Sequence, residues 1–198
     1  MNLFICVIIA CLLSCTTAKS PVEWPAKWYA QFYTNITTSG SSPLTYGTLY
    51  YSQPQGGMGM GFGQGSYQCL VRGISTECQI ISNKSGTYRV WGDFGDNCCK
   101  ESNDVMWAPS WPLDDGPTYQ GDSVDGAPFY SPMSKFTFSK IPNEYYETSD
   151  PQLPYILTFP GHDGLMDLHF NPVTMMIYGN ENFEPEFITV PSGCKPSC

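Results

Sequence analysis

The sequence predicts a mainly β protein with an antiparallel sheet that is curled or closed. Apolar residues recur with a period of two in segment after segment, and turns rich in Gly, Pro, Ser or Asn separate these segments roughly every 8–12 residues. Aromatic residues, which favour strands, make up 15% of the 198 residues. The one candidate helix is a short turn at residues 105–113, which Pro109 and Pro112 interrupt.

The first strand is expected at residues 28–36, where apolar side chains alternate with polar or tyrosine side chains. One face is therefore buried, and Asn35 lies on the solvent face. A turn at residues 39–43 leads into a second strand at residues 44–51, so the two form a hairpin. Further strands are expected at residues 67–72, 77–81, 87–91, 129–138, 145–148, 153–159, 165–170 and 173–178.

Residues 1–18 are expected to be a secretory signal peptide, and residues 19–198 a single secreted β-rich domain. The segment 3–13 is almost continuously apolar but shorter than the roughly 20 residues of a membrane span. Thr16-Thr17-Ala18 supplies the small residues that signal peptidase requires. A lipoprotein signal with a lipid on Cys15 is the alternative, and the absence of Lys or Arg before the apolar segment argues against it.

The cysteine count supports export. Three of the nine cysteines lie in the leader, and the remaining six are an even number, as a closed set of disulfides requires. Adjacent cysteines rarely bond each other, so Cys98 and Cys99 should have separate partners, while the pairing itself stays open. Zinc is the weaker alternative, because the chain contains no C-x-x-C pair. The six expected disulfide cysteines are Cys69, Cys78, Cys98, Cys99, Cys194 and Cys198.

Two glycosylation sequons, at Asn35 and Asn83, agree with an oxidising export pathway. We therefore expect a secreted glycoprotein, with a lysosome-like lumen as the alternative compartment. The net charge of −9 argues against nucleic acid and anionic membrane surfaces as partners, since both require basic patches. No transmembrane segment is expected.

The sequence offers little for catalysis. It has no G-x-S-x-G motif and its cysteines are expected to be paired, so we expect no enzyme. Asp114 and Asp115 could act as paired carboxylates, but neighbours on an extended chain point apart. A metal site can be drawn from His162, Asp163, Asp167 and His169, yet their spacing matches no known ligand pattern, and polar residues on a wet strand face are the favoured interpretation.

An acidic loop at residues 114–125, with Asp114, Asp115, Asp122 and Asp125, leaves a weakly held calcium ion as an open alternative. It lacks the D-x-D-x-D spacing of a dedicated calcium loop, so no cofactor is expected.

The run at residues 56–65 has glycine at every other position. On a strand this pattern removes side chains from one face, while Met58, Met60 and Phe62 occupy the other. Such a strand lets another backbone or an apolar ligand approach closely. A flexible hairpin arm that slips in register is the equally weighted alternative.

The order of several aromatic and cysteine landmarks resembles the secreted ependymin-related glycoproteins and the protist secreted proteins similar to them. The resemblance implies a half-open barrel, a curved antiparallel sheet of the bacterial lipoprotein-carrier type with a hydrophobic concave face. It also implies binding of lipids or other apolar molecules, sometimes with calcium, and no enzymatic activity. The landmarks are residues 24–36, 46–51, 67–69, 98–99, 107–111, 143–147, 183–187 and 190–194.

Our leading hypothesis is a secreted, glycosylated, disulfide-bonded binding protein that holds a lipid or other apolar ligand on a concave sheet. The alternative is a calcium-dependent matrix or surface-coat protein that binds extracellular matrix or itself. Candidate lining residues share an apolar or aromatic side chain on an expected strand: Phe32, Tyr50, Met58, Met60, Phe62, Trp91, Phe136, Tyr155, Leu157 and Met175.

Overall fold

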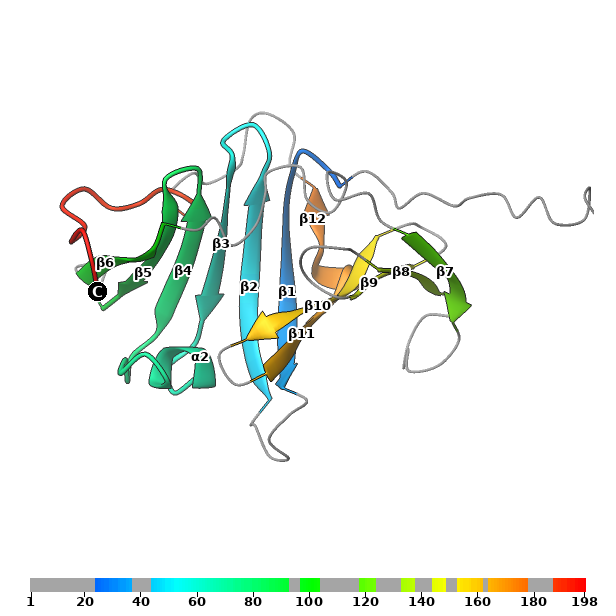
Figure 1. Ribbon diagram of the computed structural model, residues 1–198, viewed down its shortest axis with the longest axis horizontal. Coiled ribbons are helices and arrows are strands. Elements are labelled where there is room, and N and C mark those ends of the chain that lie inside the picture. Colours follow the sequence, from blue (N-terminus) through cyan, green and yellow to red (C-terminus); the bar gives the residue numbers. More distant parts are fainter. Residues whose placement is uncertain are drawn as a thin grey trace, which may run out of the picture.

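The computed structural model describes residues 24–36, 44–92, 97–103, 118–123, 133–137, 144–148, 153–161, 164–177 and 187–198. These residues form a mainly β protein with twelve strands in one antiparallel sheet (Figure 1). The strands are β1 (Lys27–Ile36), β2 (Thr45–Ser52), β3 (Gly57–Phe62), β4 (Cys78–Asn83), β5 (Gly86–Trp91), β6 (Asn97–Ser102), β7 (Thr118–Ser123), β8 (Met133–Thr137), β9 (Glu144–Thr148), β10 (Pro154–Gly161), β11 (Gly164–Phe170) and β12 (Met176–Ile177).

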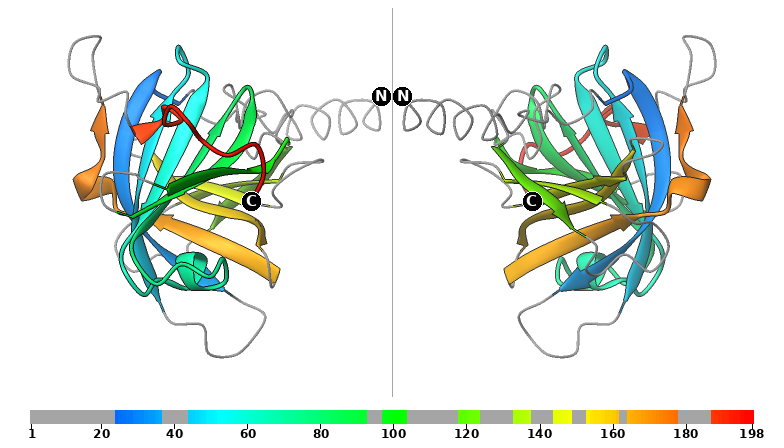
Figure 2. Two further views of the ribbon diagram at one scale, coloured as in Figure 1. Left: turned by 90° about the vertical axis from the view of Figure 1, so that its left-hand side faces the viewer. Right: turned by 90° about the vertical axis from the view of Figure 1, so that its right-hand side faces the viewer.

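The sheet has the order β6-β5-β4-β3-β2-β1-β11-β10-β9-β8-β7, so β6 and β7 form its two edges and the sheet is not closed. β11 pairs with one half of β1, and β12 pairs with the other half. Seen from the side, the sheet curls so that β8–β11 cross opposite β1–β4 (Figure 2). The expectation of a curved, open antiparallel sheet is confirmed.

The inner face of the curl is the face that carries Trp28, Ala30 and Phe32, and it holds the main hydrophobic core. Contacts across the curl join the segment before the central strand β1 to β9. The Trp24 indole Nε1 donates a hydrogen bond of 3.2 Å to the buried Tyr145 hydroxyl, which lies on β9. Burial raises the pKa of Tyr145 well above its usual value, and the charge of Glu147 adds to this effect. The curl therefore buries apolar side chains from both halves of one sheet.

Strand β1 confirms the period-two prediction. Trp28, Ala30 and Phe32 are almost fully buried, whereas Gln31 between them is exposed. Strands β2 to β6 pair in sequence order, so each strand from β2 to β5 is antiparallel to the strand that follows it in the chain. Strands β6 and β7 were not expected as such. β7 includes Asp122, so part of the expected acidic loop is a strand.

The expected strand at residues 67–72 is wrong. Tyr67–Leu70 form a short helix, α2, with backbone hydrogen bonds from Leu70 N to the Ser66 carbonyl and from Val71 N to the Tyr67 carbonyl. The chain must turn back here, because Cys69 forms a disulfide with Cys78 at a Cα–Cα distance of 5.7 Å. An extended segment would carry the chain away from Cys78.

The expected strand at residues 173–178 is only partly correct. Asn171-Pro172 forms the expected turn, in which the Asn171 side chain accepts a hydrogen bond from Val173 N. The chain then makes a 3-10 turn, η3 (Pro172–Thr174), before the short strand β12. The expected helical turn at residues 105–113 and much of the strand at 129–138 lie outside the described residues.

The alternation of Leu153, Tyr155, Leu157 and Phe159 predicts one shared face, and strand β10 departs from this prediction. Its register with β9 shifts between Pro154 and Ile156, so the regular pairing is interrupted there. Leu157 consequently packs in the main core, whereas Tyr155 belongs to a separate cluster with Met133. Among the described residues, no helix has the length and apolar content that a membrane crossing requires.

Candidate ligand groove

The glycine-rich strand β3 has two very different faces. Met58, Met60 and Phe62 point to the inner face and are almost fully buried there. On the outer face lie glycines, which leave the backbone of β3 bare. The structure thus favours close approach by another backbone over a loose hairpin arm, since β3 pairs in regular register with β2 and β4.

The segment that covers this bare face is residues 187–198, which we call the tail. A Cβ atom added to Gly59 would overlap the carbonyl oxygen of Phe187, so only glycine allows the tail to lie this close. The Gln79 side-chain amide donates a hydrogen bond to the same carbonyl oxygen. The Phe187 ring stacks on Tyr50 of β2, with 4.0 Å between ring centroids.

Two disulfides and a short ladder fix the other end of the tail to strand β6. Cys98 bonds Cys194 and Cys99 bonds Cys198, with Cα–Cα distances of 4.7 and 5.0 Å. The Lys195 N–H donates to the Cys98 carbonyl, and the Lys195 carbonyl accepts from the Lys100 N–H. The tail therefore pairs in parallel with β6 at this point. The expectation that adjacent Cys98 and Cys99 have separate partners is confirmed, as is the pairing of all six cysteines.

An open groove of about 960 Å³ lies on the outer face of the sheet, beside the tail. Its outer-face floor comes from Thr48, Gly61 and Gln79, which stand side by side on β2, β3 and β4. A Cβ atom added to Gly61 would meet only the Thr48 hydroxyl within 4 Å, so the space above this glycine is open. The tail supplies a wall through Phe187, Thr189, Val190, Pro191 and Ser192.

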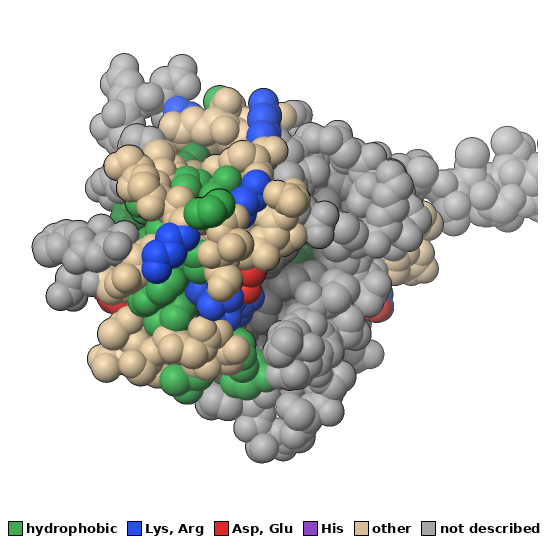
Figure 3. Space-filling model, turned by 60° about the vertical axis from the view of Figure 1, so that its left-hand side comes forward, with side chains coloured by type: hydrophobic (Ala, Val, Ile, Leu, Met, Phe, Trp, Pro, Cys, Tyr) green, Lys and Arg blue, Asp and Glu red, His purple; other side chains and the backbone are tan. Residues whose placement is uncertain are grey.

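The groove changes character along its length. Near the tail, Ile81 and Val90 belong to a small apolar cluster that Val190 joins. At the other end stand Tyr46, which is 70% exposed, and the exposed Glu77. Figure 3 shows the side of the molecule at the β5 and β6 edge, where Lys and Arg side chains lie with hydrophobic side chains between them.

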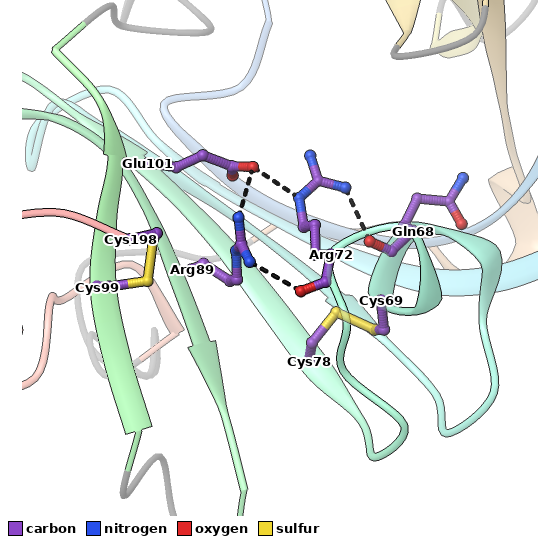
Figure 4. A network of polar contacts seen from close by, with 8 residues as sticks. All are labelled: Gln68, Cys69, Arg72, Cys78, Arg89, Cys99, Glu101 and Cys198. Carbon is purple, nitrogen blue, oxygen red and sulfur yellow. Dashed lines mark hydrogen bonds and ion pairs between the residues drawn. A yellow bond between two sulfur atoms is a disulfide. The ribbon is translucent and has the colours of Figure 1, made fainter.

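The helix α2 closes the opposite, inner face of the same strands. The Glu101 carboxylate oxygen Oε1 accepts from Arg72 Nε at 2.9 Å and from Arg89 Nη2 at 3.2 Å (Figure 4). Arg72 Nη1 also donates to the Gln68 carbonyl, and Arg89 Nη1 donates to the Arg72 carbonyl. This network and the Cys69–Cys78 disulfide hold α2 against β4–β6, so both arginines serve to position the helix.

The ten predicted lining residues do not form one site. Phe32, Phe62 and Trp91 border the groove, but their side chains lie on the inner face, where Phe32 and Phe62 are buried in the main core and Trp91 packs against it. Tyr50 lies on the outer face, where the Phe187 ring stacks on it, and it is not among the groove lining. Tyr155 lies in a separate cluster. The others are buried in the main core or pack against it: Met58, Met60, Phe136, Leu157 and Met175.

Sequence reasoning missed the tail residues of the groove. The alternating glycines indicated that something covers β3, but nothing local says which segment, because Phe187 is more than 120 residues away in the chain. The polar floor residues Thr48 and Gln79 were also missed, since their residue types are ordinary for a strand surface.

The residues that were considered for a metal site or a weakly held calcium ion are only partly described. Within the described residues, no group of three or more His, Cys, Asp or Glu side chains is arranged to hold a metal ion. His169 stacks on Tyr33 with 4.5 Å between centroids, and burial lowers its pKa, while Asp167 opposes this effect. His162, Asp163, Asp114, Asp115 and Asp125 lie outside the described residues.

The two sequons lie on strands. Asn83 is the final residue of β4, and its side-chain oxygen accepts hydrogen bonds from the Ser85 backbone N–H and from the Ser85 hydroxyl. Asn35 is in β1, where it pairs with Asp167 of β11, and its side chain lies outside the description.

Comparison with known proteins identifies a similar fold but no family. No family model matches the chain, and no curated protein matches it. Among solved structures, an uncharacterized conserved protein from Thermus thermophilus is similar, with a TM-score of 0.51 and 11% sequence identity. The match covers 87% of this chain and 90% of that chain. At this identity the similarity shows a shared fold alone.

Proposed function

We propose that this protein is a secreted, glycosylated binding protein, not an enzyme, and that it holds a lipid or other apolar molecule in the groove beneath the tail. The observation that carries the proposal is the groove of about 960 Å³. This volume is within the range of small-molecule sites, which are mostly apolar clefts with a few polar groups. The lining fits that description, since aromatic and aliphatic side chains surround Thr48 and Gln79.

The proposal moves the ligand from the inner face to the outer face. Phe32, Met60 and Leu157, which were expected to line a concave site, are each at most 2% exposed. Close packing of such side chains leaves little room for a ligand. The groove, by contrast, lies where glycine removes side chains from the floor.

Other features support the remaining parts of the proposal. Three disulfides suit an oxidising compartment, such as the export pathway or the extracellular space. The curved antiparallel sheet agrees with our further proposal that the chain is kin to the ependymin-related glycoproteins. Signal cleavage before residue 19 and glycans on Asn35 and Asn83 are parts of the same proposal.

The test uses the full chain expressed through a secretory pathway, with its disulfides intact. We expect native mass spectrometry to detect a co-purified apolar molecule, and the delipidated protein to take up the uncharged dye Nile red with a rise in fluorescence. Thr48→Trp fills the floor of the groove and should weaken dye binding by at least about ten-fold, or about 1.4 kcal/mol.

The matched control is Gln55→Trp, which adds the same side chain at an exposed turn outside the groove. This variant should bind the dye like the parent protein. Equal dye binding by Thr48→Trp and Gln55→Trp would contradict the placement of the site, and a protein that takes up no dye would contradict the function.

A further inference from the structure

The two ends of the groove differ in what they offer a ligand. The end beneath the tail carries Ile81, Val90 and Val190, which pack together as an apolar cluster. The open end carries Tyr46 and Glu77. These residues directly precede Gly47 and Cys78, which lie in one row across the sheet with Phe62 between them. A ligand with one apolar and one polar end would therefore lie in one direction, with its polar end toward the opening.

The charges at the groove exclude one class of polar end. Glu77 is the one charged residue in the described lining, and no Lys or Arg lines it. An ionised carboxylate or phosphate placed here would face the like charge of Glu77, and the described lining supplies no Lys or Arg as a counter-ion. Like charges placed together at a binding site disfavour binding.

Three basic residues of the neighbouring segments make contacts outside the groove lining. Arg72 and Arg89 both bind Glu101 on the inner face, across the sheet from the groove. The Lys100 ammonium lies over the Tyr88 ring, 5.7 Å from its centroid. None of these three side chains is among the groove lining.

The uncharged polar groups of the lining favour another class of polar end. Hydroxyl and amide groups come from Tyr46, Thr48, Gln31 and Gln79. The Gln79 amide donates to the Phe187 carbonyl, and its oxygen is an acceptor. The Glu77 carboxylate is also an acceptor. Such a set is suited to a headgroup that carries hydroxyl groups, each of which both donates and accepts.

We infer that the groove selects a single-chain amphiphile with an uncharged, hydroxyl-bearing headgroup and discriminates against the same chain ending in an ionised carboxylate. This inference rests on the proposed function, because it assigns the ligand class of that same groove. The apolar chain lies beneath the tail and the headgroup lies beside Glu77.

The experiment compares two probes with the same hydrocarbon chain, 1-monolauroylglycerol and laurate, below their micelle concentrations. Each displaces Nile red from the full, disulfide-intact chain at about pH 7.5, where laurate is ionised like other carboxylic acids. We expect monolauroylglycerol to bind at least about ten-fold more tightly than laurate. Glu77→Gln should reduce this ratio by at least about three-fold, chiefly through tighter laurate binding, because it removes the repelling charge.

The matched control is Glu144→Gln, which removes one negative charge from β9, outside the groove lining. It should leave the ratio unchanged. Laurate that binds as tightly as monolauroylglycerol, or a ratio that Glu77→Gln and Glu144→Gln alter equally, overturns the inference while the proposed function stands. If neither probe displaces the dye and the dye itself is not bound, the proposed function fails.

Discussion

The two arms of the sheet on either side of β1 and β2 are held together by different means. The stapled arm consists of β3–β6, α2 and the tail, and it contains all three disulfides seen among the described residues. The unstapled arm consists of β7–β11 and is held by strand pairing and by the inner core. Phe136, Tyr145 and Leu157 from this arm are completely buried.

The difference teaches where a covalent link is needed. Glycines on the outer face of β3 leave few side chains there for the tail to pack against, apart from Tyr50 and the Ile81 cluster. A tail with so little apolar contact would stay in place poorly without a covalent link. The disulfides of Cys98 and Cys99 supply this link, and they hold the tail in place as a wall of the groove.

Charge separates the arms as well. The described residues of the stapled arm carry five Lys or Arg residues (Arg72, Lys84, Arg89, Lys100, Lys195) and two acids (Glu77, Glu101). The described residues of the unstapled arm carry one Lys and four acids: Lys135, Asp122, Glu144, Glu147 and Asp167. Among the described residues, the arm that forms the groove is therefore basic although the whole chain is acidic.

The largest expected effect comes from removing both long-range disulfides. Replacing Cys98, Cys194, Cys99 and Cys198 by Ala should cost about 4.7 kcal/mol or more of the free energy of unfolding, because the two links close nearly the same loop of 96 to 99 residues and only the loss of both frees the unfolded chain. Urea denaturation measures the loss, and hydrogen exchange should show it first in β4–β6 while β8–β11 keep their protection.

The control for loop length is Cys69→Ala with Cys78→Ala, which opens a link across only nine residues. It should cost about 2.5 kcal/mol on the same chain-entropy argument. An equal loss of stability for the variant without the tail disulfides and the variant without Cys69–Cys78, or loss of protection spread evenly over both arms, would show that the arms are not held in different ways.

A middle-sized effect is expected from Gly59→Ala. The added methyl group would overlap the Phe187 carbonyl oxygen, so the tail must move away, at a cost of about 1–3 kcal/mol. Urea denaturation gives the cost, and limited proteolysis should cut the displaced tail sooner. Gly63→Ala is the matched control, since its Cβ atom would meet nothing within 4 Å. If both variants behave alike, the tail does not depend on the bare face of β3.

The smallest expected effect is a pH dependence from the unstapled arm. Burial lowers the pKa of His169, so the unfolded chain takes up the proton first as the pH falls. The contribution of His169 to the free energy of unfolding should therefore be fully present above about pH 6.5, the ordinary pKa of His. It should decrease as the pH falls below that value. His169→Phe retains a ring to stack on Tyr33 and should flatten the slope of the unfolding free energy between about pH 7.5 and 5.5.

Urea denaturation at several pH values measures the slope in both chains. His162 is the same in both, so it does not affect the difference. A slope that His169→Phe leaves unchanged would mean that the histidine is equally free to ionise in the folded and unfolded chains.

The sequence predicted the features that local chemistry determines. The alternation of Trp28, Ala30 and Phe32 identified β1 and its buried face. Adjacent cysteines rarely bond each other, so separate partners were predicted for Cys98 and Cys99. The alternating glycines of β3 indicated that another backbone comes close, although a loose arm had equal weight.

Features that depend on distant segments could not be predicted. Both Leu49 and Tyr50 look suited to a core, and only the register with β1 and β3 decides that Tyr50 faces outward. Residues 67–72 alternate like a strand, yet the disulfide of Cys69 bends them into α2. The groove itself needs the tail, whose place on the sheet is set by contacts across more than 90 residues of chain.

The pairing of the tail with β6 has a consequence for how copies of this protein meet each other. An open sheet ends in edge strands, whose free N–H and carbonyl groups can recruit a strand from another molecule and start aggregation. At β6, Lys195 and Cys198 take up backbone groups of Cys98 and Lys100. At β7, the other edge, the register shifts between Tyr119 and Gly121, which breaks the flat run that a second molecule would need. The tail that walls the groove thus also keeps the end of the sheet from growing.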